Sequence, residues 1–378
     1  MDQSRIFLSP PDVGGVEEKR AQDAIRSGWV APIGPDLEEF EKTVASLAER
    51  NFAVAVSSGT AALHLGLLAL GVKPGDSVIC STLTFVATAN AISYLGAVPV
   101  FVDSDPATGN LSPRLLSKAI EALVASGRKV SAVVPVDFLG SIANYQEILP
   151  ICAKFGIPVL ADSAESVGAT QSDKPAGSFG EAAIFSFNGN KIVTTSGGGA
   201  FLTDNSAHAR VVRHLSTQAR EPARHYEHEV LGYNFRMSNV LASIGNAQLS
   251  RLDDMVARRR DNRLRYRALF ENVPGVTVLG ESDFEDNCWL TAIVIEPELA
   301  GFSANEIGDF LETQNIESRP LWKPMHLQPL YGDCEAYVDG TAEGLFNNGL
   351  ALPSGSGLRE PEWERISEAL EAFLDSLR

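Results

Sequence analysis

Residues 52–70 read Phe-Ala-Val-Ala-Val-Ser-Ser-Gly-Thr-Ala-Ala-Leu-His-Leu-Gly-Leu-Leu-Ala-Leu. The apolar run at 52–56 predicts a β-strand, and the pattern at 61–70 predicts a helix that stops at Gly71. Ser57-Ser58-Gly59-Thr60 joins the two. A glycine lets an anion approach the backbone, and the N–H groups at a helix start can bind phosphate together with a threonine hydroxyl. Taken alone, however, the turn is better explained as an ordinary serine or threonine helix cap.

The same alternation of strand and helix continues from about residue 51 to 203. Apolar runs that predict strands lie at 78–80, 97–102, 132–136, 158–161 and 182–187, and helical patterns lie at 85–95, after Ser112-Pro113 and at 145–155. Continuous apolar strands are typical of a parallel sheet covered on both faces. We therefore expect an α/β domain that binds its ligand beyond the carboxyl ends of the strands.

The last third of the chain has a different pattern. A long polar helical pattern runs from about residue 246 to 272 and carries six arginines: Arg258, Arg259, Arg260, Arg263, Arg265 and Arg267. A strand at 290–295 and helices at 304–314 and 361–377 follow, which predicts a smaller α+β domain. We place the large domain at residues 1–250 and the small one at 251–378. The arginines fit a solvated or interdomain helix face better than a nucleic-acid site.

The composition of the chain also argues against a nucleic-acid site. The 378 residues include 31 Lys and Arg against 48 Asp and Glu, a net charge of −17. A chain with this negative net charge is repelled by the phosphate backbone of DNA or RNA. The four cysteines form no CxxC pair, the opening residues lack the apolar core of a signal peptide, and the most apolar stretch (61–72) is too short to span a bilayer. We expect a cytoplasmic protein without a nucleic-acid or membrane partner.

Two further positions complete a set of chemical groups. Asp162 follows the apolar run at 158–161, with Glu165 close behind, and Lys191 stands between the strand at 182–187 and Ser196-Gly197-Gly198-Gly199. A lysine amine held between a strand and a glycine-rich loop can be shielded from water and form a Schiff base. A phosphate cradle, a carboxylate for a pyridinium nitrogen and a lysine for an aldehyde are what pyridoxal phosphate requires. No Walker motif or GxGxxG is present to favour another nucleotide cofactor, which also argues against a nicotinamide dehydrogenase.

These residues belong to longer strings with a specific resemblance. The strings are Ser9-Pro10-Pro11, Gly28-Trp29-Val30-Ala31-Pro32, residues 57–65, Thr84-Phe85-Val86-Ala87-Thr88, Ala161-Asp162-Ser163-Ala164-Glu165, and residues 185–199, 232–238 and 319–326. Over nearly its whole length the chain resembles the DegT/DnrJ/EryC1/StrS family of nucleotide-sugar aminotransferases. Residues 186–191 and 216–221 resemble in particular the branch that aminates UDP-4-keto-6-deoxy-N-acetylglucosamine on the way to bacillosamine-type sugars. The resemblance implies a fold-type-I pyridoxal-phosphate transferase, with a mostly parallel sheet in the large domain.

The resemblance also implies roles for individual residues. Lys191 would form the Schiff base and Asp162 would pair with the pyridine nitrogen. The other implied cofactor contacts are Gly59, Thr60 and Ser186 at the phosphate, Phe85 on the ring face, Glu165 at the ring 3-oxygen where many relatives have glutamine, and Asn234 reaching the phosphate from a neighbouring subunit. The implied sugar-nucleotide contacts are Gly28, Trp29, Val30 and Ala31 in one segment and Trp322, Lys323, Pro324, Met325 and His326 in another. L-glutamate would be the amino donor, and Asn234 implies at least a homodimer with shared active sites.

Several alternatives stay open at this point. The sugar could be another nucleotide-linked keto sugar, GDP-perosamine-like or dTDP-linked, or the chain could be a regulatory protein that binds the cofactor without turnover. Relatives that dehydrate sugars carry histidine in place of the Schiff-base lysine, and Lys191 argues against that branch. We expect His64 to be structural, because it has the spacing of a core-facing helix residue, and we place His225 and His228 in a polar loop rather than a metal site.

Overall fold

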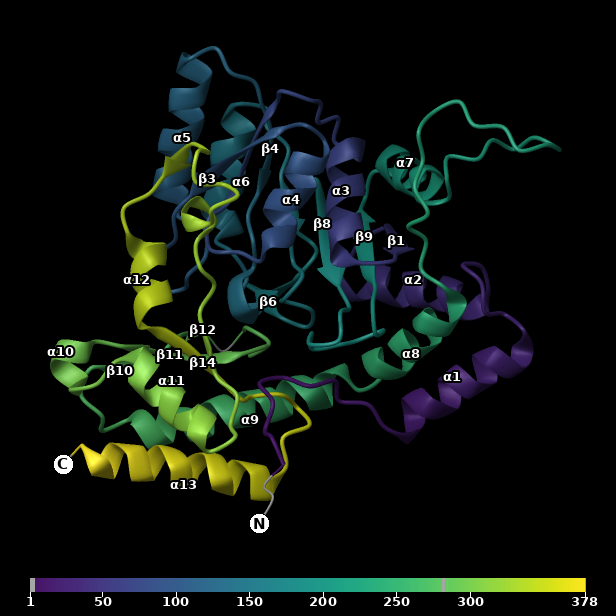
Figure 1. The fold of residues 1–378 in the computed structure, drawn as a ribbon. Coiled ribbons are helices and arrows are strands. Elements are labelled where there is room, and N and C mark those ends of the chain that lie inside the picture. Colours follow the sequence, from purple (N-terminus) through teal and green to yellow (C-terminus); the bar gives the residue numbers. More distant parts are fainter. Residues whose placement is uncertain (1–3, 281–282, 284, 378) are drawn as a thin grey trace.

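The computed structural model describes residues 4–280, 283 and 285–377. Figure 1 shows a large sheet flanked by helices, with a smaller helix–sheet layer beneath it. The larger part contains helices α1 (Gly15–Ser27), α2 (Pro35–Leu47), α3 (Gly59–Ala69), α4 (Val86–Tyr94), α5 (Pro113–Ala125), α6 (Tyr145–Lys154), α7 (Ser206–Ser216) and α8 (Asn239–Leu249), and a 3-10 turn at Phe138–Gly140. Ser112 caps α5 and Pro113 opens it, as expected.

The large sheet is mostly parallel, as predicted. Strands β3 (Val98–Val102), β2 (Ser77–Ser81) and β4 (Val130–Val134) pair in parallel, and so do β5 (Leu160–Asp162) and β8 (Ala182–Ser186). Parallel bridges from Val133 to Val159 and from Val136 to Asp162 join the two groups. Strand β9 (Gly199–Thr203) is the exception, because it runs antiparallel to both β8 and β1 (Phe52–Val56). A two-residue hairpin, β6 (Thr170–Gln171) with β7 (Lys174–Pro175), lies outside this sheet.

Helices cover both faces of the sheet, which explains the apolar strands. One buried core contains Phe40 of α2, Leu116 of α5 and Ile148 of α6. A second contains Leu65 of α3 and Ile92 of α4. Both faces of each strand are therefore removed from water, and the sequence shows no alternation of polar and apolar residues.

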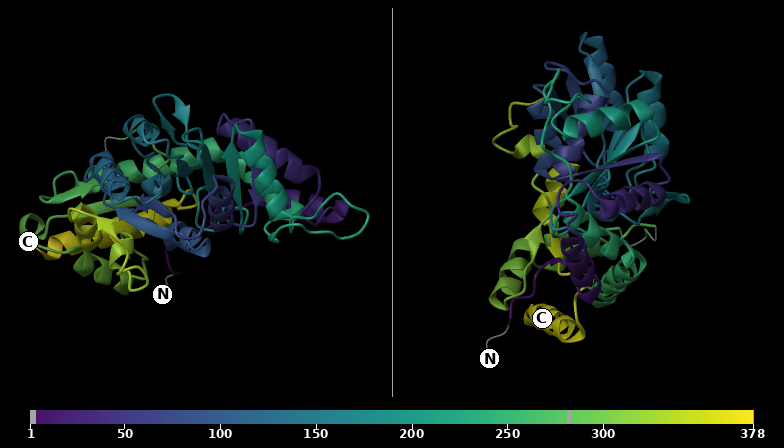
Figure 2. Two further views of the ribbon diagram at one scale, coloured as in Figure 1. Left: turned by 90° about the horizontal axis from the view of Figure 1, so that it is seen from above. Right: turned by 90° about the vertical axis from the view of Figure 1, so that its right-hand side faces the viewer.

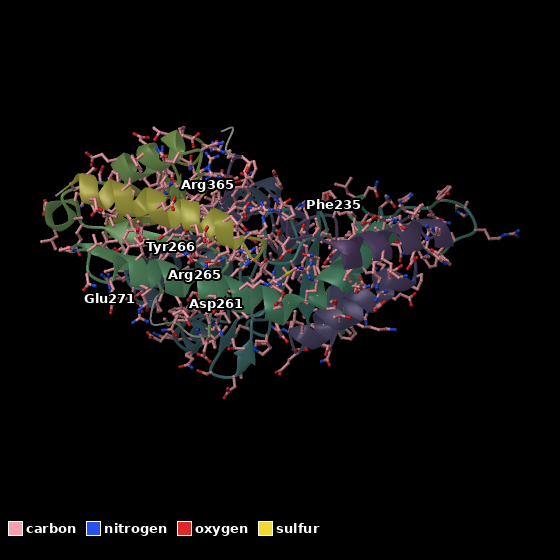
Figure 3. All side chains as sticks on the ribbon, turned by 90° about the horizontal axis from the view of Figure 1, so that it is seen from below. Phe235, Asp261, Arg265, Tyr266, Glu271 and Arg365 are labelled. Carbon is pink, nitrogen blue, oxygen red and sulfur yellow. The ribbon has the colours of Figure 1, made fainter. Side chains whose placement is uncertain are left out.

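The C-terminal part is built on a small antiparallel sheet. Its strands are β10 (Val276–Val278), β11 (Thr291–Ile295), β14 (Gly349–Leu352) and β12 (Arg319–Pro320), and its helices are α9 (Leu252–Phe270), α10 (Pro297–Ala300), α11 (Ala304–Thr313), α12 (Thr341–Asn348) and α13 (Glu360–Ser376), with a 3-10 turn at Met325–Leu327. Helices α9 and α13 lie side by side (Figure 3), where the rings of Tyr266 and Trp363 meet edge to face at 4.8 Å. Strand β13 (Ala336–Tyr337) instead joins the edge of the large sheet beside β3. The division of the chain at residue 250 stays a prediction.

The predicted start of the polar helix is wrong in one respect. Helix α8 ends at Leu249 and α9 begins at Leu252, so the pattern does not continue as one helix from about residue 246. At the break, Arg251 turns to the N-terminal segment and pairs with Asp12 and Glu17. The arginines of α9 are partly internal: Arg259 is buried, and Arg263 forms a buried ion pair with Asp286. This arrangement agrees with a helix face between two parts of the protein.

The segment between α7 and α8 extends away from the body. In the left view of Figure 2 it projects from one end of an elongated molecule. Its side chains include the exposed apolar residues Tyr226, Val230 and Leu231. No helix within the described residues is long and apolar enough to cross a membrane.

Candidate active site

A pocket of about 540 Å³ opens beyond the carboxyl ends of the parallel strands, where a ligand was expected. It brings together eight of the predicted site residues: Gly59, Thr60, Phe85, Asp162, Glu165, Ser186, Lys191 and Trp322. These residues come from loops far apart in the sequence, and the sheet topology places them side by side. Their individual roles remain predictions.

The start of α3 forms one wall of this pocket. The Ser58 hydroxyl accepts a hydrogen bond from the Ala61 N–H at 3.0 Å, so the helix-cap interpretation of this turn is correct. Gly59 also packs so closely on the next wall that a Cβ there would lie 2.8 Å from the Cβ of Ser186. Ser58, Gly59 and Thr60 also line the pocket, so the helix cap leaves the predicted anion cradle at this helix start as a prediction.

Asp162 lies at the end of β5 and is almost completely buried. Its carboxylate accepts hydrogen bonds from the Thr88 hydroxyl at 2.7 Å and the Ala164 N–H at 3.3 Å. Burial raises the pKa of this carboxyl from 3.8 to about 6, and the nearby Glu165 adds to the increase. Among the described residues, Asp162 has no ion-pair partner within hydrogen-bond distance. A cationic ligand group would suit this position.

Lys191 forms an ion pair with Glu165 at the pocket. Its Nζ lies 3.2 Å from Glu165 Oε1 and 3.9 Å from the centroid of the Trp289 ring. The second oxygen, Glu165 Oε2, accepts the Leu139 N–H at 2.9 Å. Leu139 lies in a turn with a positive φ of 52°. The carboxylate in place of the family's glutamine thus serves as the partner of the lysine ammonium.

The sequence predicted no role for two residues of this site, Thr88 and Trp289. Thr88 lies in a string quoted for the resemblance but carried no predicted role, and Trp289 had no sequence signal at all. Trp289 enters the pocket from the segment before β11, far along the chain from Lys191. Only the folded topology brings that segment to the active site.

The second predicted substrate segment lies partly in the pocket. Trp322 lines it, and Lys323 and Met325 line an adjoining hollow of about 590 Å³ together with the exposed Phe85. Pro324 precedes the 3-10 turn at Met325–Leu327, and His326 Nδ1 lies 2.7 Å from Thr82 Oγ1 at the end of β2. This segment is therefore anchored to the large sheet.

The remaining predicted residues lie elsewhere in this chain. Gly28, Trp29, Val30 and Ala31 are exposed between α1 and α2, and the Trp29 carbonyl accepts a hydrogen bond from Asn239 at 2.9 Å. Asn234 is exposed in the projecting segment. None of these five lines the Lys191 pocket. Their contacts with substrate and cofactor stay predictions.

The histidines agree with their expected places. The ring of His64 is buried among Tyr94, Tyr233 and Phe235, and burial lowers its pKa. His225 and His228 lie in the projecting segment, and no cluster of three metal ligands occurs in the part of the chain that the structure describes.

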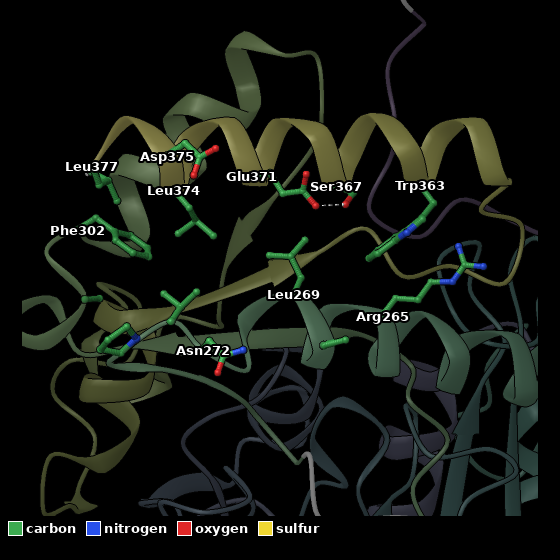
Figure 4. Close-up of a pocket in the computed structure, with 14 residues that line it drawn as sticks. Arg265, Leu269, Asn272, Phe302, Trp363, Ser367, Glu371, Leu374, Asp375 and Leu377 are labelled. Carbon is green, nitrogen blue, oxygen red and sulfur yellow. Dashed lines mark hydrogen bonds between the residues drawn. The ribbon is translucent and has the colours of Figure 1, made fainter.

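A larger hollow of about 820 Å³ lies between α9 and α13 (Figure 4). Leu269, Phe302 and Leu374 give it an apolar wall, and Arg265 and Glu371 stand at its edge. None of the predicted site residues lines it, and it lacks the converging lysine and carboxylates of the Lys191 pocket. We therefore place the chemistry at Lys191.

The groups at Lys191 suit pyridoxal phosphate. Gly59 and Thr60 at the start of α3 line the pocket beside the Ser186 hydroxyl, where a phosphate would fit, Asp162 is a buried carboxylate without an ion-pair partner among the described residues, and Lys191 is an amine on the same pocket. These three groups match the three functional ends of the cofactor.

Comparison with known proteins agrees with this assignment. Residues 11–371 match the model of the DegT/DnrJ/EryC1/StrS aminotransferase family. The chain belongs to this family. It is 45% identical over 371 residues to EpsN of Bacillus subtilis (strain 168), described as a pyridoxal phosphate-dependent aminotransferase, covering 97% of this chain and 95% of EpsN. It is 36% identical over 379 residues to the GDP-perosamine synthase of Caulobacter vibrioides, covering 99% of each chain.

A solved structure agrees as well. The pyridoxal phosphate form of Spr1654 from Streptococcus pneumoniae, described as a sugar aminotransferase, superposes with a TM-score of 0.89 at 27% identity, covering 99% of this chain and 100% of that one. The protein is thus a pyridoxal phosphate-dependent sugar aminotransferase with the fold-type-I architecture.

Proposed function

We propose that this aminotransferase moves the amino group of L-glutamate to C4 of a UDP-linked 4-keto-6-deoxy-N-acetylhexosamine. The product would be a UDP-2-acetamido-4-amino-2,4,6-trideoxyhexose. The observation that carries the chemistry is the placement of Lys191 and Asp162 on one pocket with the start of α3 between them. The resemblance of residues 186–191 and 216–221 to the bacillosamine branch supports the sugar.

Each group has a distinct task in this proposal. Bound pyridoxal phosphate supplies an aldehyde for the amine and a ring that accepts the electrons of a carbanion. Gly59, Thr60 and Ser186 would hold the phosphate, and Phe85 would contact the ring. Asp162 would keep a proton on the ring nitrogen, and Glu165 would contact the ring 3-oxygen.

Lys191 does the proton transfer. Once glutamate has taken its place, the free Nζ would remove the proton from the donor's α-carbon and deliver it to the carbon that carried the cofactor's aldehyde. The order is reversed for the keto sugar, so the same Nζ serves both half-reactions. Trp322, Lys323, Pro324, Met325 and His326 would then line the path of the sugar nucleotide.

A GDP-linked 4-keto sugar is the second candidate, because the relative with 36% identity is a GDP-perosamine synthase. The two candidates differ in the base and in the substituent at C2.

A pair of absorbance measurements tests the proposal. Glutamate should bleach the long-wavelength band of the holoenzyme, and UDP-4-keto-6-deoxy-N-acetylglucosamine should restore it. Restoration by GDP-4-keto-6-deoxymannose alone would contradict the UDP assignment and favour the second candidate. Failure of glutamate to bleach the band would reject glutamate as donor, and bleaching without turnover of any sugar would favour a regulatory protein.

We also propose that the protein works as a homodimer with shared active sites. Asn234 and residues 28–31 lie away from their own Lys191 pocket and are exposed. Exposed apolar side chains accompany both segments: Ile25, Trp29, Val30 and Ile33 near the first, and Tyr226, Val230 and Leu231 near the second. Large apolar side chains gathered on a surface favour contact with a second copy.

Co-expression of Lys191→Ala and Asn234→Ala subunits tests this sharing. Loss of a hydrogen bond to the charged phosphate should weaken cofactor binding by Asn234→Ala by about 10–100-fold. At limiting cofactor, each variant alone should be nearly inactive. A mixed dimer would combine both changes in one site and leave the other intact, so a random mixture should recover about one quarter of the wild-type rate. No recovery in verified mixed dimers would place Asn234 on its own subunit's site or remove its role.

A further inference from the structure

The free amine of Lys191 is held from two sides. Glu165 Oε1 lies 3.2 Å from Nζ, and the Trp289 ring centroid lies 3.9 Å from it. An ammonium group this close to the face of an indole is attracted by the negative face of the ring. The carboxylate and the ring therefore define one position for the amine, at the edge of the pocket where Asp162 also lies.

Trp289 is fixed at every polar atom it has. Its indole Nε1–H donates to the Asn190 carbonyl at 2.8 Å, next to Lys191 itself. Its backbone N–H donates to Asn287 Oδ1 at 2.9 Å, and its carbonyl accepts from Arg259 Nη1 at 2.6 Å. The side chain is 1% exposed and meets the Trp322 ring edge to face. An indole held this way keeps one orientation whether or not the lysine is free.

The residues that hold Trp289 are buried polar groups, whose burial costs free energy that a role in packing alone would not require. Arg259 is fully buried, donates only to the Trp289 carbonyl and the Ser9 hydroxyl, and leaves its Nε without a partner among the described residues. Burial lowers the pKa of this guanidinium from 12.5 to about 10. Asn287 is also buried, and its amide donates to the carbonyls of Glu165 and Val167. One asparagine thus ties the tryptophan to the loop that carries Glu165.

We propose that Trp289 is a positioning residue for Lys191, whose indole face holds the ammonium of the released lysine opposite Glu165. This inference rests on the proposed role of Lys191 and adds to it. A lysine that has taken a proton from the donor must keep it, in a defined place, until it is returned. The ring stabilises that charged form without offering an acceptor that could take the proton.

The labelling rate of Lys191 in the apoprotein gives a test without turnover. An amine reagent such as trinitrobenzenesulfonate reacts with the uncharged amine, and mass spectrometry of the Lys191 peptide reports its rate across a pH series. Without the ring's attraction the amine loses its proton more readily. We expect Trp289→Leu to shift the labelling profile to lower pH and raise the rate near neutral pH by about two- to thirty-fold, with Trp289→Phe between the two.

Greater access to the lysine would produce a different result. Access alone scales the rate equally at every pH and does not move the profile. Trp363→Leu is the matched control, because Trp363 of α13 contacts Arg265 and Tyr266 of α9 and does not line the Lys191 pocket, so it should leave the profile unchanged. If the leucine variant does not fold, fluorinated tryptophans at position 289 keep the shape and weaken the ring face in steps, and the profile should follow those steps.

If the pH profile of Lys191 labelling in the leucine or fluorinated variants stays where it is in the wild type, the proposal is overturned. An equal shift of that profile in Trp289→Phe and Trp289→Leu also overturns it. In the holoenzyme we expect Trp289→Leu to lower kcat with little change in KM for glutamate, because the amine acts after the donor has bound. The labelling result is independent of the sugar. Failure of the proposed sugar substrate would therefore leave this inference intact, and a negative labelling result would leave the proposed function intact.

Discussion

Replacing Lys191 with alanine is expected to lower transamination by at least about 10⁴-fold, because the variant loses both the nucleophile and the proton carrier. Proton transfer by a positioned side chain alone contributes about 10²–10⁴-fold. The assay is steady-state turnover with glutamate and the keto sugar. The variant should still bind pyridoxal phosphate, since the α3 cradle and Asp162 are unchanged, but without the long-wavelength band of the lysine-bound form.

Two further variants separate chemistry from charge. Lys191→Arg keeps a cation that can face Glu165 and Trp289, yet it cannot form a Schiff base or release a proton near neutral pH. It should be as inactive as the alanine variant. Lys174→Ala, at an exposed position in β7, should retain the wild-type rate. Appreciable turnover by Lys191→Ala would remove the assigned role of Lys191.

The residues predicted correctly are those whose signals are local. The strand at 52–56 has the predicted limits, and Ser58 and Ser112 cap the helices that follow them. Asp162 could be placed because it directly follows an apolar run, and in a parallel sheet all such residues gather at one edge. The mostly parallel sheet followed from strands that are largely apolar runs without a regular alternation of polar and apolar residues.

The features missed depend on contacts between distant segments. Nothing in the run at 199–203 distinguishes an antiparallel strand from its parallel neighbours, because it is buried on both faces like them. The break before Leu252 is stabilised by the pairing of Arg251 with residues near the N-terminus. Trp289 lies next to Lys191 only because the C-terminal part packs on the active-site edge of the large sheet. Such contacts leave no periodic signal in either segment.

The Asp162→Asn variant is expected to lose activity and gain stability at the same time. Asparagine can still accept the Thr88 hydroxyl but carries no charge to hold the proton of a ring nitrogen. Loss of a preorganised electrostatic partner at the reacting group typically costs about 10²–10³-fold in rate. Asp162→Ala should be impaired at least as severely. Asp173→Asn, in an exposed turn, is the control and should be fully active.

The gain in stability follows from the raised pKa. In the folded apoprotein Asp162 titrates at about 6, against an ordinary value of 3.8. The folded state therefore holds a proton that the unfolded state has lost, and stability falls as the pH rises from about 4 to 6. Above that range the penalty is constant, at about 3 kcal/mol for this single group. Asparagine does not titrate, so the variant avoids the penalty.

Urea unfolding of the apoproteins at two pH values measures this difference. At pH 7.5 Asp162→Asn should be more stable than the wild type by about 1–3 kcal/mol, and near pH 4 the two should be equal. Equal differences at both pH values would contradict titration of Asp162 as the cause. Saturating pyridoxal phosphate should reverse the order at pH 7.5, because only the wild-type carboxylate then gains a cation, and tighter binding to the folded state stabilises it further. The charge that destabilises the empty fold is thus the one that the bound cofactor uses.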